Sequence, residues 1–136
     1  MQTLLVIEDE LEITDYLKEY FTHRNVQLLH ATGGEEGLAL LEKNHPDLLL
    51  LDLKLGSGIS GIEVLRRVRA MKTPLPIIVV TAVDDPNVEI LVHGLGATDY
   101  VLKPLKLEDI ERVVLSRLKA SARSIPGTTA GSSPAV

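Results

Sequence analysis

Four apolar segments of this chain each end in residues that can do chemistry. These residues are Glu8 and Asp9 after the segment 4–7, Asp52 after 48–51, Thr81 after 77–80, and Lys103 after 100–102. Asp52 is the most informative, because a carboxylate at the end of a leucine run lies at the rim of an apolar core. A charge in that position is tolerated only where cations or hydrogen-bond donors compensate it. We therefore expect residues from the other strand ends to surround Asp52.

The elements that must position these residues alternate along the sequence. Short β-branched or leucine-rich runs are each followed by a stretch of helical periodicity, which predicts five βα units around a parallel sheet. The segment 26–31 contains Gln27 and His30 among its apolar residues and therefore suits an edge of the sheet. With right-handed crossovers, the predicted strand order is 2-1-3-4-5. The expected fold class is α/β, a flavodoxin-like (βα)5 three-layer sandwich.

The same patterns predict helix boundaries and buried faces. Capping boxes are expected at 32–35 and 60–63, and Asp85 followed by Pro86 marks another helix start. The first helix should bury Ile13, Tyr16, Leu17, Tyr20 and Phe21. The fourth helix should bury Val88, Leu91, Val92 and Leu95 and end at Gly94 or Gly96. The fifth helix should bury Leu107, Ile110, Val113, Val114 and Leu118.

The composition narrows the possible functions. The chain has 136 residues, no cysteine, 45% hydrophobic but only 3% aromatic residues, and a net charge of -5. The absence of cysteine excludes disulfides, thiol catalysis and thiolate metal sites. An acidic chain with few aromatic residues lacks the basic and stacking surfaces that bind nucleic acids, so we expect no direct nucleic-acid binding.

The length favours a single folded domain at residues 1–120. Residues 121–136 are mostly small and polar, and we expect them to form a flexible Ser/Gly/Pro-rich tail or linker. The N-terminus shows neither a basic leader nor a long apolar stretch, and no apolar run approaches the roughly 18 residues of a membrane span. We therefore expect a cytoplasmic protein with no membrane attachment.

The predicted topology brings the polar strand ends together. Ligands of open α/β sheets bind beyond the carboxyl ends of the strands, and the strand order makes Glu8, Asp9 and Asp52 neighbours. Three neighbouring carboxylates repel one another unless a cation lies among them, and Mg²⁺ prefers oxygen ligands of this kind. Lys103 can reach a phosphate from the last strand, and the Thr81 hydroxyl can donate to one. This set predicts phosphoryl transfer in which Asp52 is the nucleophile and forms an acyl phosphate.

Each residue also has a simpler explanation when it is taken singly. Asp9 could be only a helix N-cap, Lys103 a solvated surface residue, and Thr81 an ordinary β-branched strand residue. Their joint placement at strand ends favours a phosphate and metal site over coincidence.

The motifs around these residues resemble the receiver domain of bacterial two-component response regulators. The resemblance covers roughly residues 3–119. It rests on Leu-Leu-Val-Ile-Glu-Asp-Glu at 4–10, Leu-Leu-Leu-Leu-Asp-Leu-Lys-Leu at 48–55, Ile-Ile-Val-Val-Thr-Ala at 77–82, and Gly-Ala-Thr-Asp-Tyr-Val-Leu-Lys-Pro at 96–104. Motifs in this order are specific to the family.

The resemblance implies a role for each site residue. Asp52 would be the phosphoacceptor, Asp9 a direct Mg²⁺ ligand, and Glu8 a second acidic ligand that acts through water. The backbone carbonyl of Lys54 would be a further metal ligand. Lys103 would pair with the phosphoryl group, and its bond to the following proline would be a cis peptide.

The resemblance also implies a conformational switch. Thr81 and Tyr100 would be the switch pair: the threonine hydroxyl moves to the phosphate and the aromatic ring turns inward. The surface formed by the fourth helix, the fifth strand and the fifth helix would then change. This surface would engage a downstream effector protein or domain, or a second copy of the chain.

The implied function is a phosphorylation-dependent signalling switch. A sensor histidine kinase or a phosphotransfer protein would supply the phosphoryl group. The domain would not be an enzyme that turns over substrates, since it would catalyse only its own phosphoryl transfer and dephosphorylation. The alternative is a constitutive protein–protein interaction module of the same fold that does not use phosphorylation.

Three features depart from the usual family pattern. Glu8 and Asp9 stand where two aspartates are commoner, which lengthens one metal-binding arm by a methylene. The loop after Asp52 lacks the usual proline and is one residue longer before the following helix. Leu105 replaces the usual aromatic residue after the Lys-Pro pair, which we expect to alter partner choice and to leave the chemistry unchanged.

Other α/β families fit these residues less well. Residues 56–61 match the dinucleotide-binding pattern G-x-G-x-x-G, but they follow the third strand, and Asp52 would repel a pyrophosphate. Flavodoxins need an uncharged loop after the first strand, where this chain has three acidic residues. Phosphatases with an aspartate nucleophile usually carry a second aspartate two positions later, where this chain has Lys54.

Overall fold

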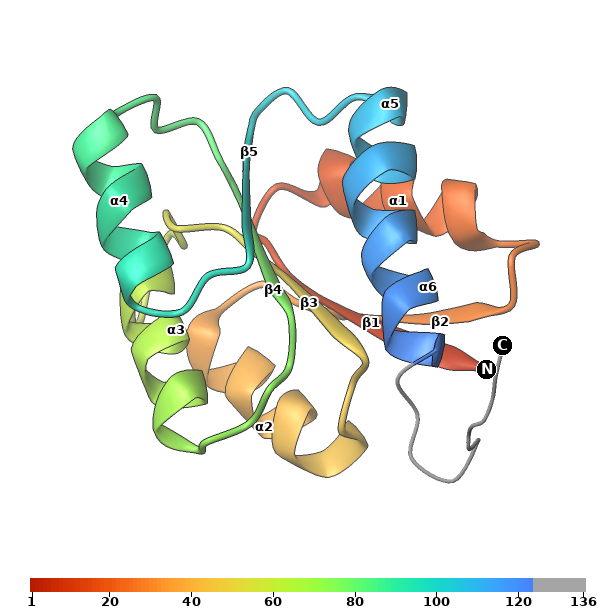
Figure 1. Ribbon diagram of the computed structural model, residues 1–136, viewed down its shortest axis with the longest axis horizontal. Coiled ribbons are helices and arrows are strands. Elements are labelled where there is room, and N and C mark those ends of the chain that lie inside the picture. Colours follow the sequence, from red (N-terminus) through yellow and green to blue (C-terminus); the bar gives the residue numbers. More distant parts are fainter. Residues whose placement is uncertain (124–136) are drawn as a thin grey trace.

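A parallel five-stranded sheet forms the centre of the protein in the computed structural model, which describes residues 1–123. Its strand order is β2-β1-β3-β4-β5, and all four strand pairs are parallel (Figure 1). The strands are β1 (Gln2–Ile7), β2 (Val26–Ala31), β3 (Leu48–Leu51), β4 (Ile77–Thr81) and β5 (Asp99–Leu102). The predicted fold class and strand order are confirmed, including the edge position of β2.

Helices follow each strand. They are α1 (Leu11–Phe21), α2 (Gly34–Asn44), α3 (Gly61–Ala70), α4 (Pro86–Gly94), and a last helical segment made of α5 (Leu107–Asp109), the π-helical η1 (Ile110–Leu115) and α6 (Ser116–Arg123). The predicted fifth helix is therefore present, with a wider turn in its middle. It continues past residue 120, where the predicted domain boundary lies. The rest of the predicted tail lies outside the described residues.

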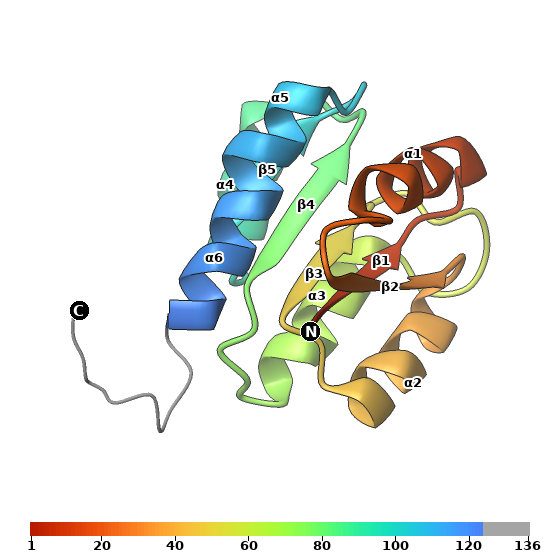
Figure 2. The ribbon, with the colours of Figure 1, turned by 90° about the vertical axis from the view of Figure 1, so that its right-hand side faces the viewer.

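The helices cover both faces of the sheet, because side chains of a strand alternate between its two faces. In β3, Leu49 and Leu51 belong to the core cluster that packs under α2, α3 and α4. Leu48 and Leu50 belong to the cluster on the other side, under α1 and the last helical segment. Figures 1 and 2 show these two layers of helices on opposite sides of the strands. A strand buried on both faces explains the unbroken leucine run before Asp52.

Three residues expected in buried helix faces are exposed instead. Tyr16 is 38% exposed, Leu91 47% and Leu107 50%. Tyr16 and Leu91 lie at the flank of the apolar stripe, Leu107 is the first residue of its helix, and Val92 is the buried residue of α4. The prediction of burial was wrong at these positions, since periodicity identifies a face without its width.

The helix starts agree with the sequence in two cases of three. The Ser60 hydroxyl accepts a hydrogen bond from Glu63 N at 3.2 Å, and Asp85 caps α4. The capping box at 32–35 was wrong, because α2 begins one residue later with Gly33 as N-cap and no side-chain cap. The carboxylate of Glu35 bonds elsewhere, to Ile59 N.

Candidate functional site

The carboxyl ends of four neighbouring strands bring the predicted site residues together. Backbone pairing continues past the strand ends, since Asp52 N donates to Ile7 O at 3.0 Å and Lys103 N donates to Thr81 O at 2.9 Å. Glu8, Asp52 and Thr81 are all nearly inaccessible, with 2%, 4% and 0% of their surface exposed. The polar side chains that follow the apolar strands therefore meet at one edge of the sheet, at the point where strand order reverses.

Lys103 is the cation among the acidic residues. Its Nζ atom lies 3.0 Å from Asp52 Oδ2 and 3.2 Å from a carboxylate oxygen of Glu8, and it also bonds to Glu10. The Lys103–Pro104 peptide bond is cis, as the resemblance implied. The Lys103 ammonium compensates the negative charge of the buried carboxylates. It thereby offsets the desolvation free energy of Asp52 at the edge of the core, although the two residues are 51 positions apart.

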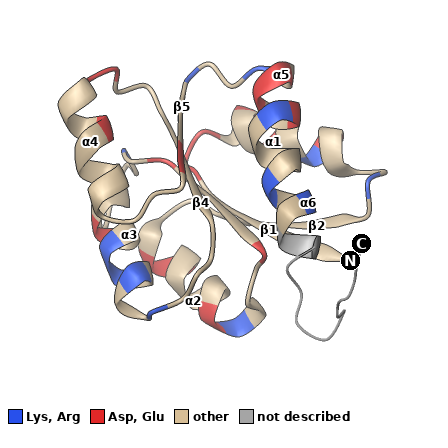
Figure 3. Cartoon of the chain, viewed as in Figure 1, with Lys and Arg blue, Asp and Glu red and all other residues tan. Residues whose placement is uncertain are grey.

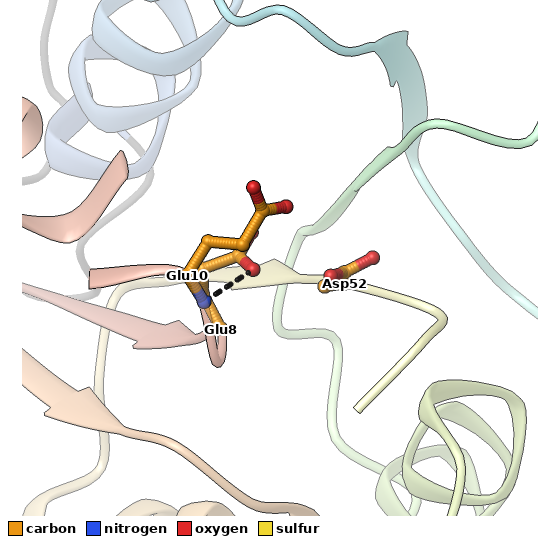
Figure 4. Close-up of side chains that lie close together, drawn as sticks. All are labelled: Glu8, Glu10 and Asp52. Carbon is orange, nitrogen blue, oxygen red and sulfur yellow. Dashed lines mark hydrogen bonds between the residues drawn. The ribbon is translucent and has the colours of Figure 1, made fainter. Parts of the chain in front are cut away.

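Three acidic side chains form a compact set of oxygen donors. One carboxylate oxygen from each of Glu8, Glu10 and Asp52 lies within 4.8 Å of the other two. Figure 4 shows the three side chains near one another, with Glu10 N donating to Glu8 Oε2 at 3.1 Å. Hard oxygen donors at this spacing fit a small divalent cation such as Mg²⁺, which is typically held by one or two carboxylates and by water.

The two titratable groups at the centre of the site have shifted pKa values. Burial is the main cause that raises the pKa of the Glu8 carboxyl to about 7. The hydrogen bond from Glu10 N lowers this pKa, the charge of Asp52 raises it further, and the charge of Lys103 lowers it. Burial alone would lower the pKa of Lys103, but its bonds to Glu10 and Asp52 raise it above the usual value. The lysine therefore stays charged at neutral pH, whereas Glu8 is close to half protonated.

Asp9 is not part of this acidic set. It is exposed, and its Oδ2 atom accepts a hydrogen bond from Gly56 N at 3.1 Å, in the loop after β3. Asp9 was predicted to be a metal ligand, whereas no role was predicted for Glu10. The alternation of side chains past the end of β1 is the signal that points to Glu10, since residues 8 and 10 leave the chain on the same side. The acidic loop after β1 is red in Figure 3.

Lys54 contacts the site through its backbone. Its N–H donates to Asp52 Oδ1 at 3.2 Å, while its side chain is exposed. The two Asp52 oxygens are therefore bonded to different residues, one to Lys54 and the other to Lys103. These bonds fix the rotation of the carboxylate.

The predicted switch residues meet at Val83, in the loop after β4. Thr81 Oγ1 accepts a hydrogen bond from Val83 N at 3.3 Å, and the Tyr100 hydroxyl donates to Val83 O. Burial raises the pKa of Tyr100, helped by the nearby charges of Glu89 and two aspartates. One residue therefore connects the threonine at the site with the tyrosine on β5.

The fold and the site define a doubly wound α/β domain with an acidic, lysine-bridged centre at its topological switch point. The sequence matches the model of the response regulator receiver domain over residues 4–115. The chain belongs to this family, which confirms the resemblance. Receiver domains are regulatory parts of two-component response regulators, consistent with signalling by phosphorylation.

Curated relatives carry corresponding names. The chain is 42% identical over 125 residues to the transcriptional regulatory protein AfsQ1 of Streptomyces coelicolor, covering 90% of this chain and 52% of that protein. It is 33% identical over 126 residues to the response regulator ArlR of Staphylococcus aureus, covering 93% of this chain and 55% of that protein. The chain thus spans about half the length of these relatives.

Solved structures agree with the fold. The BeF3-activated N-terminal receiver domain of Klebsiella pneumoniae RstA superposes with a TM-score of 0.77 at 27% identity, over 90% of this chain and 100% of that one. A CheY-like receiver domain protein of Methanospirillum hungatei gives a TM-score of 0.83 at 23% identity, over 92% and 99% of the two chains, and shows the fold alone. None of the helices in the described part of the chain could cross a membrane.

Proposed function

We propose that this domain is a phosphorylation-controlled switch in which Asp52 accepts a phosphoryl group from a sensor histidine kinase or a phosphotransfer protein. The observation that carries the proposal is the buried Asp52 carboxylate at the end of β3, held 3.0 Å from the Lys103 ammonium beside two further carboxylates. An aspartate that served only as a helix cap would need neither the lysine nor the acidic neighbours.

The chemistry follows from the groups present. A carboxylate oxygen of Asp52 attacks the phosphorus of a phosphohistidine, so that a P–O bond forms while the P–N bond breaks. The electron pair stays on the imidazole nitrogen, which takes a proton from solvent. Lys103 pairs with the phosphoryl oxygens, and the Thr81 hydroxyl, whose oxygen accepts from Val83 N, donates its own proton to one of them. The domain would catalyse only this transfer and the later hydrolysis.

Mg²⁺ is the expected cofactor. Glu8, Asp9, Asp52 and the backbone carbonyl of Lys54 would hold it, and the position of Glu10 supports a contribution from that residue as well. When bound, the ion supplies positive charge that stabilises the phosphoryl oxygens during transfer. Asp9 accepts from Gly56 N through Oδ2, so it would bind the ion through its other oxygen or by giving up this bond.

The output surface would be the face of α4, β5 and the last helical segment. Large apolar side chains are exposed there, with Ile90 at 70% and Leu102 at 40%. A groove of about 390 Å³ runs beside them between β5 and the last helical segment. Such a surface suits a downstream effector protein or domain, or a second copy of the chain. A cytoplasmic location belongs to the same proposal.

Incubation with a small phosphodonor such as acetyl phosphate and Mg²⁺ tests the proposal. Intact-mass spectrometry should show one added phosphoryl group, which disappears in Asp52→Asn. No adduct, or an adduct that persists in Asp52→Asn, would favour a constitutive interaction module of the same fold.

The metal ligands are tested by Mg²⁺ titration, followed by amide chemical shifts in NMR spectra. Asp9→Asn and Glu10→Gln each remove one negative charge from neighbouring positions and therefore serve as matched controls for each other. A loss of Mg²⁺ affinity confined to Asp9→Asn would assign Asp9 as the direct ligand. A loss confined to Glu10→Gln would assign Glu10 instead.

A further inference from the structure

A carboxylate from α2 holds the tip of the loop that follows Asp52. Glu35 lies in the first turn of α2, and its Oε2 atom accepts a hydrogen bond from Ile59 N at 3.2 Å. We propose that Glu35 is a positioning residue that keeps this β3–α3 loop, and with it the backbone of Lys54, in the geometry that phosphorylation of Asp52 requires. The inference rests on the proposed function.

A backbone hydrogen bond closes the loop at its base. Gly61 N donates to Leu53 O at 3.0 Å, which closes the loop where α3 begins. Between these points the chain carries Gly56 and Gly58 and lacks the usual proline, which gives the backbone additional conformational freedom, while the side chains of Leu55 and Ile59 pack against the core. A loop of this kind needs contacts from outside to keep one conformation.

Glu35 fits closely against the loop tip. Gly58 has a φ of +79°, and a Cβ built on it would lie 2.5 Å from Glu35 Oε1. A Cβ on Gly34 would lie 2.5 Å from the Ile59 side chain. Glycines on both sides therefore allow the start of α2 and the loop to approach within hydrogen-bonding distance. Figure 2 shows the yellow loop bending toward the start of the orange α2.

The position of Glu35 also suits its charge. A carboxylate in the first turn of a helix is stabilised by the helix dipole, and a bond from a backbone N–H to a charged oxygen is stronger than one to a neutral oxygen. The residue is exposed, so its effect should be moderate.

A second carboxylate, that of Asp9, accepts from Gly56 N in the same loop. If Asp9 gave up this bond to bind Mg²⁺ through Oδ2, the loop would lose one of its contacts with other elements. Among the described residues, the bond between Ile59 and Glu35 would then be the remaining one from a loop amide to a side chain outside the loop. Glu35 would therefore matter most when the site is loaded.

Three variants test the role of Glu35. Glu35→Ala removes the acceptor, Glu35→Gln keeps an acceptor oxygen without the charge, and Glu36→Ala is a matched control. Glu36 lies in the same turn but bonds to Thr32 N at 3.2 Å and not to the loop. The readouts are amide hydrogen exchange at Ile59, Mg²⁺ affinity, and the rate of phosphorylation by acetyl phosphate.

In Glu35→Ala, exchange at Ile59 should accelerate about five- to tenfold, as expected for one lost hydrogen bond, and Mg²⁺ affinity and phosphorylation rate should fall severalfold. Glu35→Gln should largely restore all three, and Glu36→Ala should resemble the wild type. Unchanged exchange and rate in Glu35→Ala, or equal changes in Glu36→Ala, would overturn the proposal while wild-type phosphorylation persists. A wild-type protein that takes up no phosphoryl group would overturn the proposed function and this inference together.

Discussion

Gly61 begins α3 so close to Asp52 that no other residue fits: a Cβ on Gly61 would lie 2.1 Å from the carbonyl oxygen of Asp52 and 2.6 Å from Leu53 Cα. Both neighbours are backbone atoms, so neither can move aside without moving the chain that carries the Asp52 carboxylate. The last glycine of the G-x-G-x-x-G pattern is thus explained by packing of a helix start against a strand end.

Gly61→Ala should therefore destabilise the protein by about 1–3 kcal/mol, the usual cost of overpacking. It should also slow phosphorylation of Asp52, because the backbone must shift. Urea denaturation and acetyl phosphate labelling measure the two effects. Gly94→Ala is the control, since nothing lies within 4 Å of its Cβ position. Equal stability of the two variants would show that the α3 start can relax at no cost.

The contribution of Glu8 to the stability of the protein should fall as pH rises from about 4.5 to 7. The pKa of Glu8 is about 7 in the folded protein and 4.5 in its ordinary state. Between these values the folded state binds more protons than the unfolded state, so raising the pH favours unfolding. The full effect is on the order of 3 kcal/mol. It is absent below the lower pKa and complete above the higher one.

Urea denaturation at pH 5 and pH 8 checks this expectation. Glu8→Gln should reduce the difference in the free energy of unfolding between pH 5 and pH 8. The change in stability caused by Glu8→Gln, relative to the wild type, should therefore be more favourable at pH 8 than at pH 5. Glu42→Gln, on the exposed side of α2, should keep the wild-type pH dependence. A Glu8→Gln profile parallel to the wild type would show that Glu8 does not carry this proton.

The centre of the site was predictable because topology decides it. Once parallel strands and the order 2-1-3-4-5 are inferred, residues that follow the strands must meet, and Asp52, Lys103 and Glu8 do so. The family motifs add the cis peptide before Pro104, which alternation and periodicity cannot predict.

The loop contacts were not predictable in this way. The bond from Ile59 to Glu35 joins residues 24 positions apart, and that from Gly56 to Asp9 joins residues 47 positions apart. Both depend on the path of an irregular loop, which has no side-chain period to read. For the same reason the sequence suggested a capping box for Glu35, while the folded chain uses its carboxylate across a gap between two elements.

Thr14 offers a stability test away from the site. Its side chain is 1% exposed, and its hydroxyl has no hydrogen-bond partner among the described residues. Thr14→Val, which replaces the hydroxyl with a methyl group of similar size, should stabilise the protein by about 1 kcal/mol, since a buried unpaired hydroxyl is costly. The control Thr22→Val loses a bond to Lys18 O and should not stabilise. A destabilised Thr14→Val would reveal a partner for the hydroxyl.

Thr81 and Tyr100 should be energetically coupled through Val83. Their hydroxyls bond to the N–H and the carbonyl of the same residue, Val83. Because movement of Thr81 toward a phosphoryl group frees the Val83 N–H, it should also loosen the carbonyl that receives the Tyr100 hydroxyl. The two side chains are then energetically coupled without touching.

A double-mutant cycle measures this coupling. Thr81→Val and Tyr100→Phe should each destabilise by about 1 kcal/mol, and the double variant by less than the sum, with a difference of at least about 0.5 kcal/mol. The reason is that either change alone already frees the Val83 segment. The control is Tyr20→Phe, because the Tyr20 hydroxyl bonds to Glu111 and not to Val83. Its effect on stability should add to that of Thr81→Val. Additivity of Thr81→Val with Tyr100→Phe as well would mean that Val83 transmits nothing between them, and the proposed switch would need another connection.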